Sequence, residues 1–281
     1  MSIALLKTLT GPPPKILYQY LLAPTALAKI SVPPSTGNIL AGKRIKVSDP
    51  RNLNDPFDMI PAMTRNVSPE EHRAYLEEAA RRRGIYEKIP PVFVVDFKAE
   101  YERKTVDPES EFKSVVVRSR ILCLSKNPRG VMMWSHYASR HTGFVVGFKS
   151  DVLEKDPPVC TFFNVTYSEE RLACVPRDFE VIDRAYGLLN KVFSKKSVEW
   201  SYEEEWRCLL GISQLSEDEY LPYSAEAVDC IILGSQMKEE TELTLKNAFT
   251  AGGFNQRVKL MRASLSKEKF EINLAPTLWR V

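Results

Sequence analysis

Short apolar segments of strand length, spread along the chain without a regular alternation with helices, constrain the fold most. Residues 16–21, 143–148 and 230–233 are examples, and residues 115–124 are apolar on both faces for part of their length, which is typical of a central strand. Because helices do not follow every strand, the pattern does not fit a doubly wound parallel sheet. We expect an α+β fold with a mixed, mostly antiparallel central sheet, flanking helices and a helical insertion. Further strands are expected at 43–48, 161–167, 205–210 and 258–263, and helices at 23–30, 128–138, 179–193 and 237–250.

A polar, helix-rich region interrupts these sheet elements. Capping residues predict a helix over 69–83, and a charged segment over 96–104 is also expected to be helical. We interpret residues 62–112 as an insertion or lid within a single domain over 15–281. Residues 1–14, with three consecutive prolines near their end, form a lead-in.

The composition is that of an ordinary globular protein, with 44% hydrophobic and 27% charged residues. A net charge of +3 without a basic stripe does not indicate a dedicated DNA-binding protein. The five cysteines are scattered and form no C-x-x-C pair, so neither a zinc site nor a disulfide framework is indicated. No stretch approaches the ~20 apolar residues of a membrane span. We therefore expect a cytoplasmic protein without a bound metal or a membrane partner.

The first candidate site is the segment 200–207, Trp-Ser-Tyr-Glu-Glu-Glu-Trp-Arg. If it is a strand, Glu203, Glu205 and Arg207 share one face, and Trp206 lies on the opposite, core-facing side. Two carboxylates beside an arginine can perform acid–base chemistry or hold a sugar hydroxyl. The same spacing also fits a solvent-facing strand with an ion pair. Trp200 and Tyr202 are expected to form a stacking wall if the strand begins only at Glu203.

The second candidate site is the segment 134–137, Trp-Ser-His-Tyr, with His141 close behind. His136 can donate or accept a proton near neutral pH. Its spacing from His141 matches no common zinc motif, and the chain has no nucleophile elbow. A helix end with a hydrogen-bonded core histidine and packed Trp134 and Tyr137 explains the segment equally well.

Two further segments carry residues suited to a ligand. Tyr18 and Tyr20 share one face of the first strand, where core packing is an alternative to ligand stacking. Residues 54–57, Asn-Asp-Pro-Phe, have the chemistry of a turn, where loop capping is an alternative to binding. The chain has neither a G-x-G-x-x-G fingerprint nor a phosphate-binding P-loop, so a Rossmann cofactor or P-loop nucleotide is not supported.

The order of four motifs resembles a bacterial domain family of unknown function. The motifs are Leu-Tyr-x-Tyr at 17–20, Asn-Asp-Pro-Phe at 54–57, Trp-Ser-His-Tyr at 134–137 and Trp-x-Tyr-Glu-x-Glu-Trp-Arg at 200–207. The resemblance extends over residues 15–265 and carries no settled activity.

The arrangement also resembles the ADP-ribosyltransferase superfamily, which uses NAD. There an aromatic, His or Arg position on the first strand is followed by a Ser/Thr strand and then by a Glu-x-Glu pair. Tyr18 or Tyr20, then Ser48, then Glu203 and Glu205 follow that order, although the chain lacks a first-strand His or Arg and a Ser-Thr-Ser run. The resemblance implies that Glu205 is catalytic and stabilises the positive charge that develops at the anomeric carbon.

Our leading hypothesis is therefore an ADP-ribosyltransferase-like enzyme that consumes NAD, a small-molecule nucleotide, as a bacterial defence or toxin effector. The acceptor, a protein or a nucleic acid, is left open. The alternatives are a metal-independent hydrolase or nuclease that uses His136 with Glu203 and Glu205, and a non-enzymatic module that binds a nucleotide or peptide. The expected catalytic residues are Glu205, Glu203 and His136, and the expected cofactor-binding residues are Tyr18, Tyr20, Ser48, Trp134, Tyr137 and Arg207. The 134–137 and 203–207 segments are expected side by side, with His136 in reach of a carboxylate directly or through one water.

Overall fold

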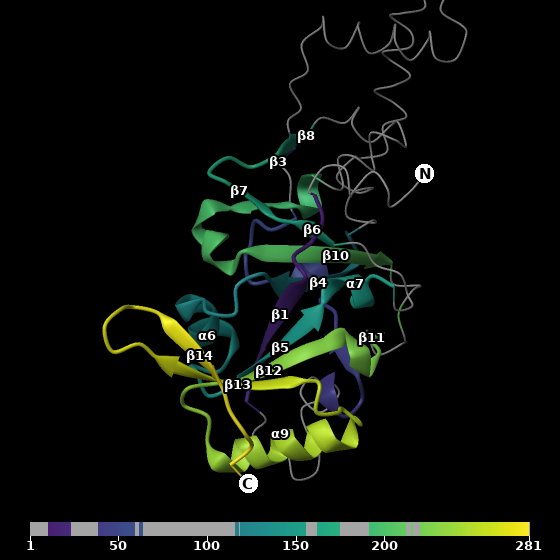
Figure 1. Cartoon of the computed structure of the whole chain (residues 1–281). Coiled ribbons are helices and arrows are strands. Elements are labelled where there is room, and N and C mark those ends of the chain that lie inside the picture. The colour runs from purple at the N-terminus through teal and green to yellow at the C-terminus, as the bar shows by residue number, and fades with distance from the viewer. Residues whose placement is uncertain are drawn as a thin grey trace, which may run out of the picture.

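A computed structural model describes residues 11–23, 39–59, 62–63, 116–117, 119–155, 162–174, 191–211, 215 and 220–280 (Figure 1). Its main feature is an eight-stranded sheet with the strand order β14-β13-β12-β5-β1-β4-β10-β6. Neighbouring strands are antiparallel except β12 and β13, which are parallel. The expected mixed, mostly antiparallel sheet of an α+β fold is therefore confirmed.

The elements of the described residues have the following bounds. The large sheet contains β1 (Ile16–Leu21), β4 (Ser119–Ser125), β5 (Phe144–Lys149), β6 (Phe162–Asn164), β10 (Glu205–Gly211), β12 (Val228–Leu233), β13 (Lys259–Leu265) and β14 (Ile272–Pro276). Three two-stranded pairs are β2 (Arg44–Lys46) with β11 (Tyr220–Pro222), β3 (Ala62–Met63) with β8 (Ala173–Cys174), and β7 (Thr166–Ser168) with β9 (Lys195–Ser197). The helices are α6 (Val131–Tyr137), α7 (Ser150–Leu153), α9 (Glu239–Ala251) and the 3-10 helices η1 (Pro50–Asn52), η4 (Val198–Glu203) and η6 (Ala225–Ala227).

Two helices cover opposite faces of the large sheet. Successive residues of a strand point to opposite faces, so Val145 and Val146 of β5 belong to different hydrophobic clusters. Leu245 of α9 packs in the cluster of Val146, and Trp134 of α6 packs in the cluster of Val145. Figure 1 shows α9 along the lower edge of the sheet and α6 beside β1 and β14. The strands are therefore buried on both sides near the middle of the sheet, as expected for β4.

Local chemistry explains where two of the elements end. Gly252 follows α9 directly, as expected, and its backbone N–H bonds the carbonyl of Ala248. The expected strand over 161–167 is divided at Val165, because β6 pairs with β10 whereas β7 pairs with β9. Within the described ranges, no helix is long and apolar enough to span a membrane.

Several expectations lie outside the described residues. The insertion or lid over 62–112 is described only at residues 62–63, and the helix expected over 23–30 only at residue 23. The amphipathic helix over 179–193 is described only at residues 191–193, which are helical.

Candidate functional site

The strand register places the polar residues of three neighbouring strands in one row. Ser125 of β4 pairs with Tyr18 of β1 on one side and with Glu205 of β10 on the other. Adjacent strands lie about 4.8 Å apart, and residues two apart along a strand share a face. Tyr20 and Arg207 therefore point to the same side as this row. The spacing of tyrosines and charged residues in the sequence thus becomes a single polar surface across the sheet.

A glycine on the next strand leaves room for the Tyr18 ring. Gly147 of β5 pairs with Tyr18 in the sheet. A Cβ atom at position 147 would lie 3.0 Å from Tyr18 Cε1 and 2.6 Å from Cys230 Sγ. The missing side chain therefore lets the Tyr18 ring and the Cys230 thiol lie over this part of the sheet.

The two glutamates reach this surface from different elements, so the strand expected over 205–210 is confirmed, whereas a strand over all of 200–207 is wrong. The strand begins at Glu205, whereas Glu203 ends the 3-10 helix η4. Ser197 caps η4 at its N-terminus by accepting from the backbone N–H of Glu199, and Glu204 has a left-handed φ of 45°. Glu204 lies between Glu203 and Glu205, and the side chains of both neighbours are buried. Strand alternation is correct from Glu205 onward, where Trp206 packs in the main core on the opposite face.

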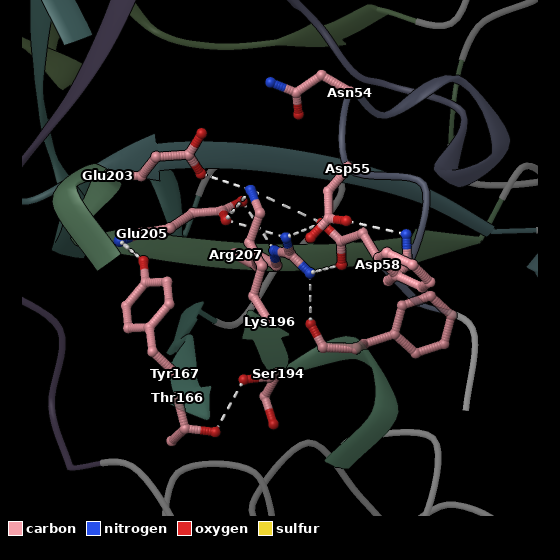
Figure 2. A network of polar contacts seen from close by, with 12 residues as sticks. Asn54, Asp55, Asp58, Thr166, Tyr167, Ser194, Lys196, Glu203, Glu205 and Arg207 are labelled. Atoms are coloured by element: carbon pink, nitrogen blue, oxygen red, sulfur yellow. Dashed lines mark hydrogen bonds and ion pairs between the residues drawn. The ribbon is translucent and has the colours of Figure 1, made fainter. Parts of the chain in front are cut away.

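These glutamates belong to a buried network of five charged side chains (Figure 2). Lys196 Nζ lies 2.5 Å from Glu203 Oε2, 3.4 Å from Glu205 Oε2 and 3.8 Å from Asp58 Oδ2. Arg207 donates to both oxygens of Glu205 at 2.7 and 2.9 Å and to both oxygens of Asp58 at 2.8 and 2.5 Å. Each of the five side chains is at most 6% exposed. The alternative of a solvent-facing ion pair at 203–207 is therefore wrong.

Burial and the neighbouring charges affect the two glutamates differently. Burial raises the pKa of Glu203, and the nearby Lys196 ammonium only partly opposes this effect. Burial also acts on Glu205, but Arg207 and Lys196 outweigh it and lower the pKa of Glu205 to about 2. Burial lowers the pKa of Lys196, but the carboxylates of Glu205 and Glu203 outweigh it, so that this pKa is raised. Glu205 is thus held ionised, whereas Glu203 is the carboxylate that takes up a proton more readily.

The segment 134–137 contacts this network through its tyrosine. The Tyr137 hydroxyl donates to Glu203 Oε1 at 2.5 Å, and it accepts from Asn54 Nδ2 at 2.5 Å. The expected proximity of 134–137 and 203–207 is therefore confirmed. His136 is exposed, and its ring lies beside those of Tyr137 and Tyr202. Within the described residues, Tyr137 rather than His136 provides the hydrogen bond to a glutamate.

A cavity of about 200 Å³ opens onto the row and the network. Its lining includes seven of the nine residues expected in the site, namely Tyr18, Tyr20, Ser48, Tyr137, Glu203, Glu205 and Arg207. Asn54, Cys123 and Lys196 also contribute to its wall. The structure therefore brings together residues from all four sequence motifs around one hollow. We call it the tyrosine cavity.

Trp134 was expected to contact the cofactor, but the structure places it in the core. Its ring is fully buried, packs edge-to-face on Tyr20 at 5.5 Å, and donates through Nε1 to the carbonyl of Pro128. Neither Trp134 nor His136 is among the described residues that line the tyrosine cavity. His141 contacts Ser135 Oγ through Nε2 at 3.2 Å and stacks beside Trp134. These contacts match the packing interpretation of Trp134, which holds α6 against β1.

Two charged residues of the network were not anticipated from the sequence. Asp58 follows the Asn-Asp-Pro-Phe turn and lies 149 positions before Arg207. Lys196 lies on β9, 11 positions before Arg207. The sequence indicated only that a further cation was needed, because the motif has two carboxylates, Glu203 and Glu205, and one cation, Arg207. A buried carboxylate requires a partner.

No three His, Cys, Asp or Glu side chains of the described ranges lie where they would hold a metal ion.

Part of the chain matches a known protein family. Residues 133–208 match a family model described as "Protein of unknown function (DUF2971)". The matched segment includes residues 133–137 of α6, all of η4 and the first residues of β10, and it does not reach residues 17–20 or 54–57. No curated protein and no solved structure matches the chain. Over the segment that links Tyr137 to Glu203, the chain is therefore similar to a family whose function is unknown.

Proposed function

We propose that this protein is an ADP-ribosyltransferase-like enzyme that binds NAD in the tyrosine cavity and breaks the bond between nicotinamide and ribose. One observation carries the proposal. The cavity joins tyrosine rings to a buried network in which three carboxylates face only two cations. This combination favours a planar ligand with a positive charge, such as the oxidised nicotinamide ring.

The charge balance supports the choice of ligand. Asp58, Glu203 and Glu205 contribute three negative charges when ionised, whereas Lys196 and Arg207 contribute two positive charges. A buried excess of negative charge is stabilised by a cation that enters the cavity. Tyrosine faces attract the same cation through the ring quadrupole.

The same carboxylates suit the reaction. When the anomeric carbon–nitrogen bond breaks, nicotinamide leaves with the bonding electron pair and positive charge develops on the ribose. A preorganised carboxylate beside that carbon stabilises the developing charge. An acceptor hydroxyl or amine then bonds to the anomeric carbon and gives its proton to a base, for which a carboxylate is suited.

The contacts favour Glu203 over Glu205 for this role, although the order of the motifs assigns it to Glu205. Both oxygens of Glu205 accept from Arg207, and its pKa is lowered to about 2. Glu203 lies at the cavity wall with Tyr137 and Lys196 on its two oxygens, and its pKa is raised. In this proposal Glu203 meets the reacting ribose or acceptor, and Glu205 positions Arg207 and Lys196.

The two alternatives lack an observation of this kind. A hydrolase or nuclease that uses His136 requires this ring near a glutamate, and in the described residues His136 is exposed beside Tyr137 and Tyr202. A non-enzymatic module needs no buried group with a raised pKa, whereas Glu203 is such a group at a cavity wall.

The proposal is tested by comparing oxidised NAD with NADH in calorimetric titrations of the purified chain. The two dinucleotides differ in that only the oxidised nicotinamide ring is charged. We expect oxidised NAD to bind at least about tenfold more tightly, which corresponds to ~1.4 kcal/mol. Glu203→Gln should reduce this preference, and the neighbouring Glu204→Gln, whose side chain is 33% exposed, should leave it unchanged. Equal binding of the two forms, or no binding of either, would contradict the proposal.

A further inference from the structure

A second and larger cavity also has Lys196 in its wall. Its volume is about 460 Å³, within the range of roughly 300–1,000 Å³ that is usual for ligand sites. Lys196 lines both this cavity and the tyrosine cavity. The described part of its wall comes from the Asn-Asp-Pro-Phe turn, the residues after β7, β9 and the start of η4. We call it the turn cavity.

An acceptor without a partner lies in the wall of the turn cavity. Asp55 is 4% exposed, and its Oδ1 accepts from the backbone N–H of Phe57 at 2.9 Å. Its Oδ2 is buried and has no hydrogen-bond partner in the described part of the chain. A buried carboxylate oxygen without a donor is unfavourable. A ligand that donates a hydrogen bond from the cavity would therefore stabilise Asp55.

Aromatic rings of the same wall suit a planar ligand. The Phe57 ring is 60% exposed and already holds the planar guanidinium of Arg171 at 5.4 Å from its centroid. Trp200 lines the cavity as well. Such rings stack on nucleobases, and an arginine plane commonly adds to the stack.

The charges of the wall are mixed and do not select a simple ion. Arg171 and Lys195 line the turn cavity together with three exposed glutamates at positions 169, 170 and 199. A lone cation or a lone anion would meet like charge there. A nucleotide presents a neutral base with donor groups at one end and phosphates at the other. Its base suits Asp55 and Phe57, and its phosphates suit Lys195 and Arg171.

We infer that the turn cavity binds an adenine nucleotide, with the exocyclic amine of adenine donating to Asp55 Oδ2 and the ring stacking on Phe57. This inference rests in part on the proposed function, because adenine forms the other end of NAD and Lys196 lines both cavities. The inference assigns a binding role to Asp55 and Phe57 of the Asn-Asp-Pro-Phe turn. Asn54 faces the tyrosine cavity, and Asp55 and Phe57 face the turn cavity.

The test uses adenosine 5′-monophosphate and purine riboside 5′-monophosphate, which differ only in the amine or hydrogen at position 6 of the purine. In titrations of the full chain, the adenine nucleotide should bind about tenfold more tightly, because only it donates to Asp55 Oδ2. Asp55→Asn keeps the acceptor for the Phe57 backbone and can present an amide donor in place of Oδ2, so the preference should disappear. Phe57→Ala should weaken both nucleotides by about tenfold.

Glu199→Gln is the matched control, because it removes a charge from the same wall without touching Asp55. It should leave the preference for the adenine nucleotide unchanged. Equal affinity for the two nucleotides, absence of binding at millimolar concentration, or an unchanged preference in Asp55→Asn would overturn the inference. Adenine discrimination without a preference for oxidised NAD over NADH would instead overturn the proposed function alone. Tight binding of NAD without adenine discrimination would overturn only the assignment of the turn cavity.

Discussion

The Tyr137 hydroxyl lies 2.5 Å from Glu203 Oε1 and joins helix α6 to the 3-10 helix η4. These residues are 66 positions apart in the chain. Burial is the main cause of the raised pKa of Tyr137, and the carboxylate of Glu203 contributes to it, so the phenol keeps its proton and acts as the donor. This contact therefore brings the segments 134–137 and 200–207 together in one site.

Tyr137→Phe should remove the donor to Glu203 and the acceptor of Asn54 while keeping the ring. We expect a loss of about 1–2 kcal/mol of unfolding free energy, because the bond has a charged acceptor but is partly exposed to water. Tyr20→Phe is the control, since the Tyr20 hydroxyl donates to the neutral carbonyl of Asn127 at 2.7 Å. Its cost should be about 1 kcal/mol or less. Urea denaturation measures both variants, and a Tyr137→Phe variant as stable as the parent would contradict a contribution of this contact to folding.

Glu205→Gln tests whether the buried network stabilises the fold. An exposed pair with Arg207 would contribute at most about 1 kcal/mol. Arg207 is fully buried, however, and Gln leaves its charge less compensated. We therefore expect a loss of about 3–5 kcal/mol. The control Glu204→Gln removes the charge of a surface pair with Lys126, whose side chain is 51% exposed, and its amide oxygen can still accept from Asn127 Nδ2. It should change stability by less than about 1 kcal/mol. Equal effects in urea denaturation would contradict the burial of the network.

The two glutamates should give opposite dependences of stability on pH. The pKa of Glu205 is lowered from its ordinary 4.5 to about 2, so the unfolded state takes up a proton first as the pH falls. Its contribution, on the order of 3 kcal/mol, is present above pH 4.5 and is lost between about pH 4.5 and 2. The pKa of Glu203 is raised, so the folded state holds the proton more tightly. Its contribution is present below pH 4.5 and is lost as the pH rises through the raised value.

Unfolding free energies of the parent, Glu203→Gln and Glu205→Gln between pH 2.5 and 7 measure this difference. The destabilisation caused by Glu205→Gln should shrink as the pH falls. Relative to the parent, Glu203→Gln should become more favourable as the pH rises. If the stability differences of both variants from the parent changed in the same direction with pH, the two carboxylates would not lie in the distinct environments described above.

The sheet was largely predictable because its strands carry long apolar runs. Residues 143–148 and 230–233 became β5 and β12 with bounds within two residues. Strand β14 was not anticipated, since Ile272 and Leu274 are its only large apolar residues and Pro276 ends it. The 3-10 helix η4 was also missed. Its formation depends on the Ser197 cap and on the left-handed Glu204, a conformation that glycine rather than glutamate normally suggests.

The site was only partly predictable, because its charges pair over long sequence separations. The motif at 200–207 indicated Glu203, Glu205 and Arg207 together. No periodicity points to Asp58, which lies 149 positions from its partner Arg207. Trp134 was assigned to the ligand because its neighbours are polar, whereas the helix α6 turns its ring into the core. Pairing of distant charges and the direction of a helix face depend on tertiary structure, which a local motif does not specify.

The rate of nicotinamide release from NAD tests the central claim most directly. The purified chain is incubated with NAD labelled in the nicotinamide ring, with and without a heat-treated cell extract that supplies acceptors but no active enzymes. We expect release above the rate in buffer by the parent and by Glu204→Gln, and release about a hundredfold slower by Glu203→Gln, which corresponds to ~2.7 kcal/mol of lost transition-state stabilisation. Circular dichroism of each variant establishes that it is folded. No release by the folded parent in either condition, or an undiminished rate in folded Glu203→Gln, would contradict a site in which Glu203 acts on the nicotinamide–ribose bond.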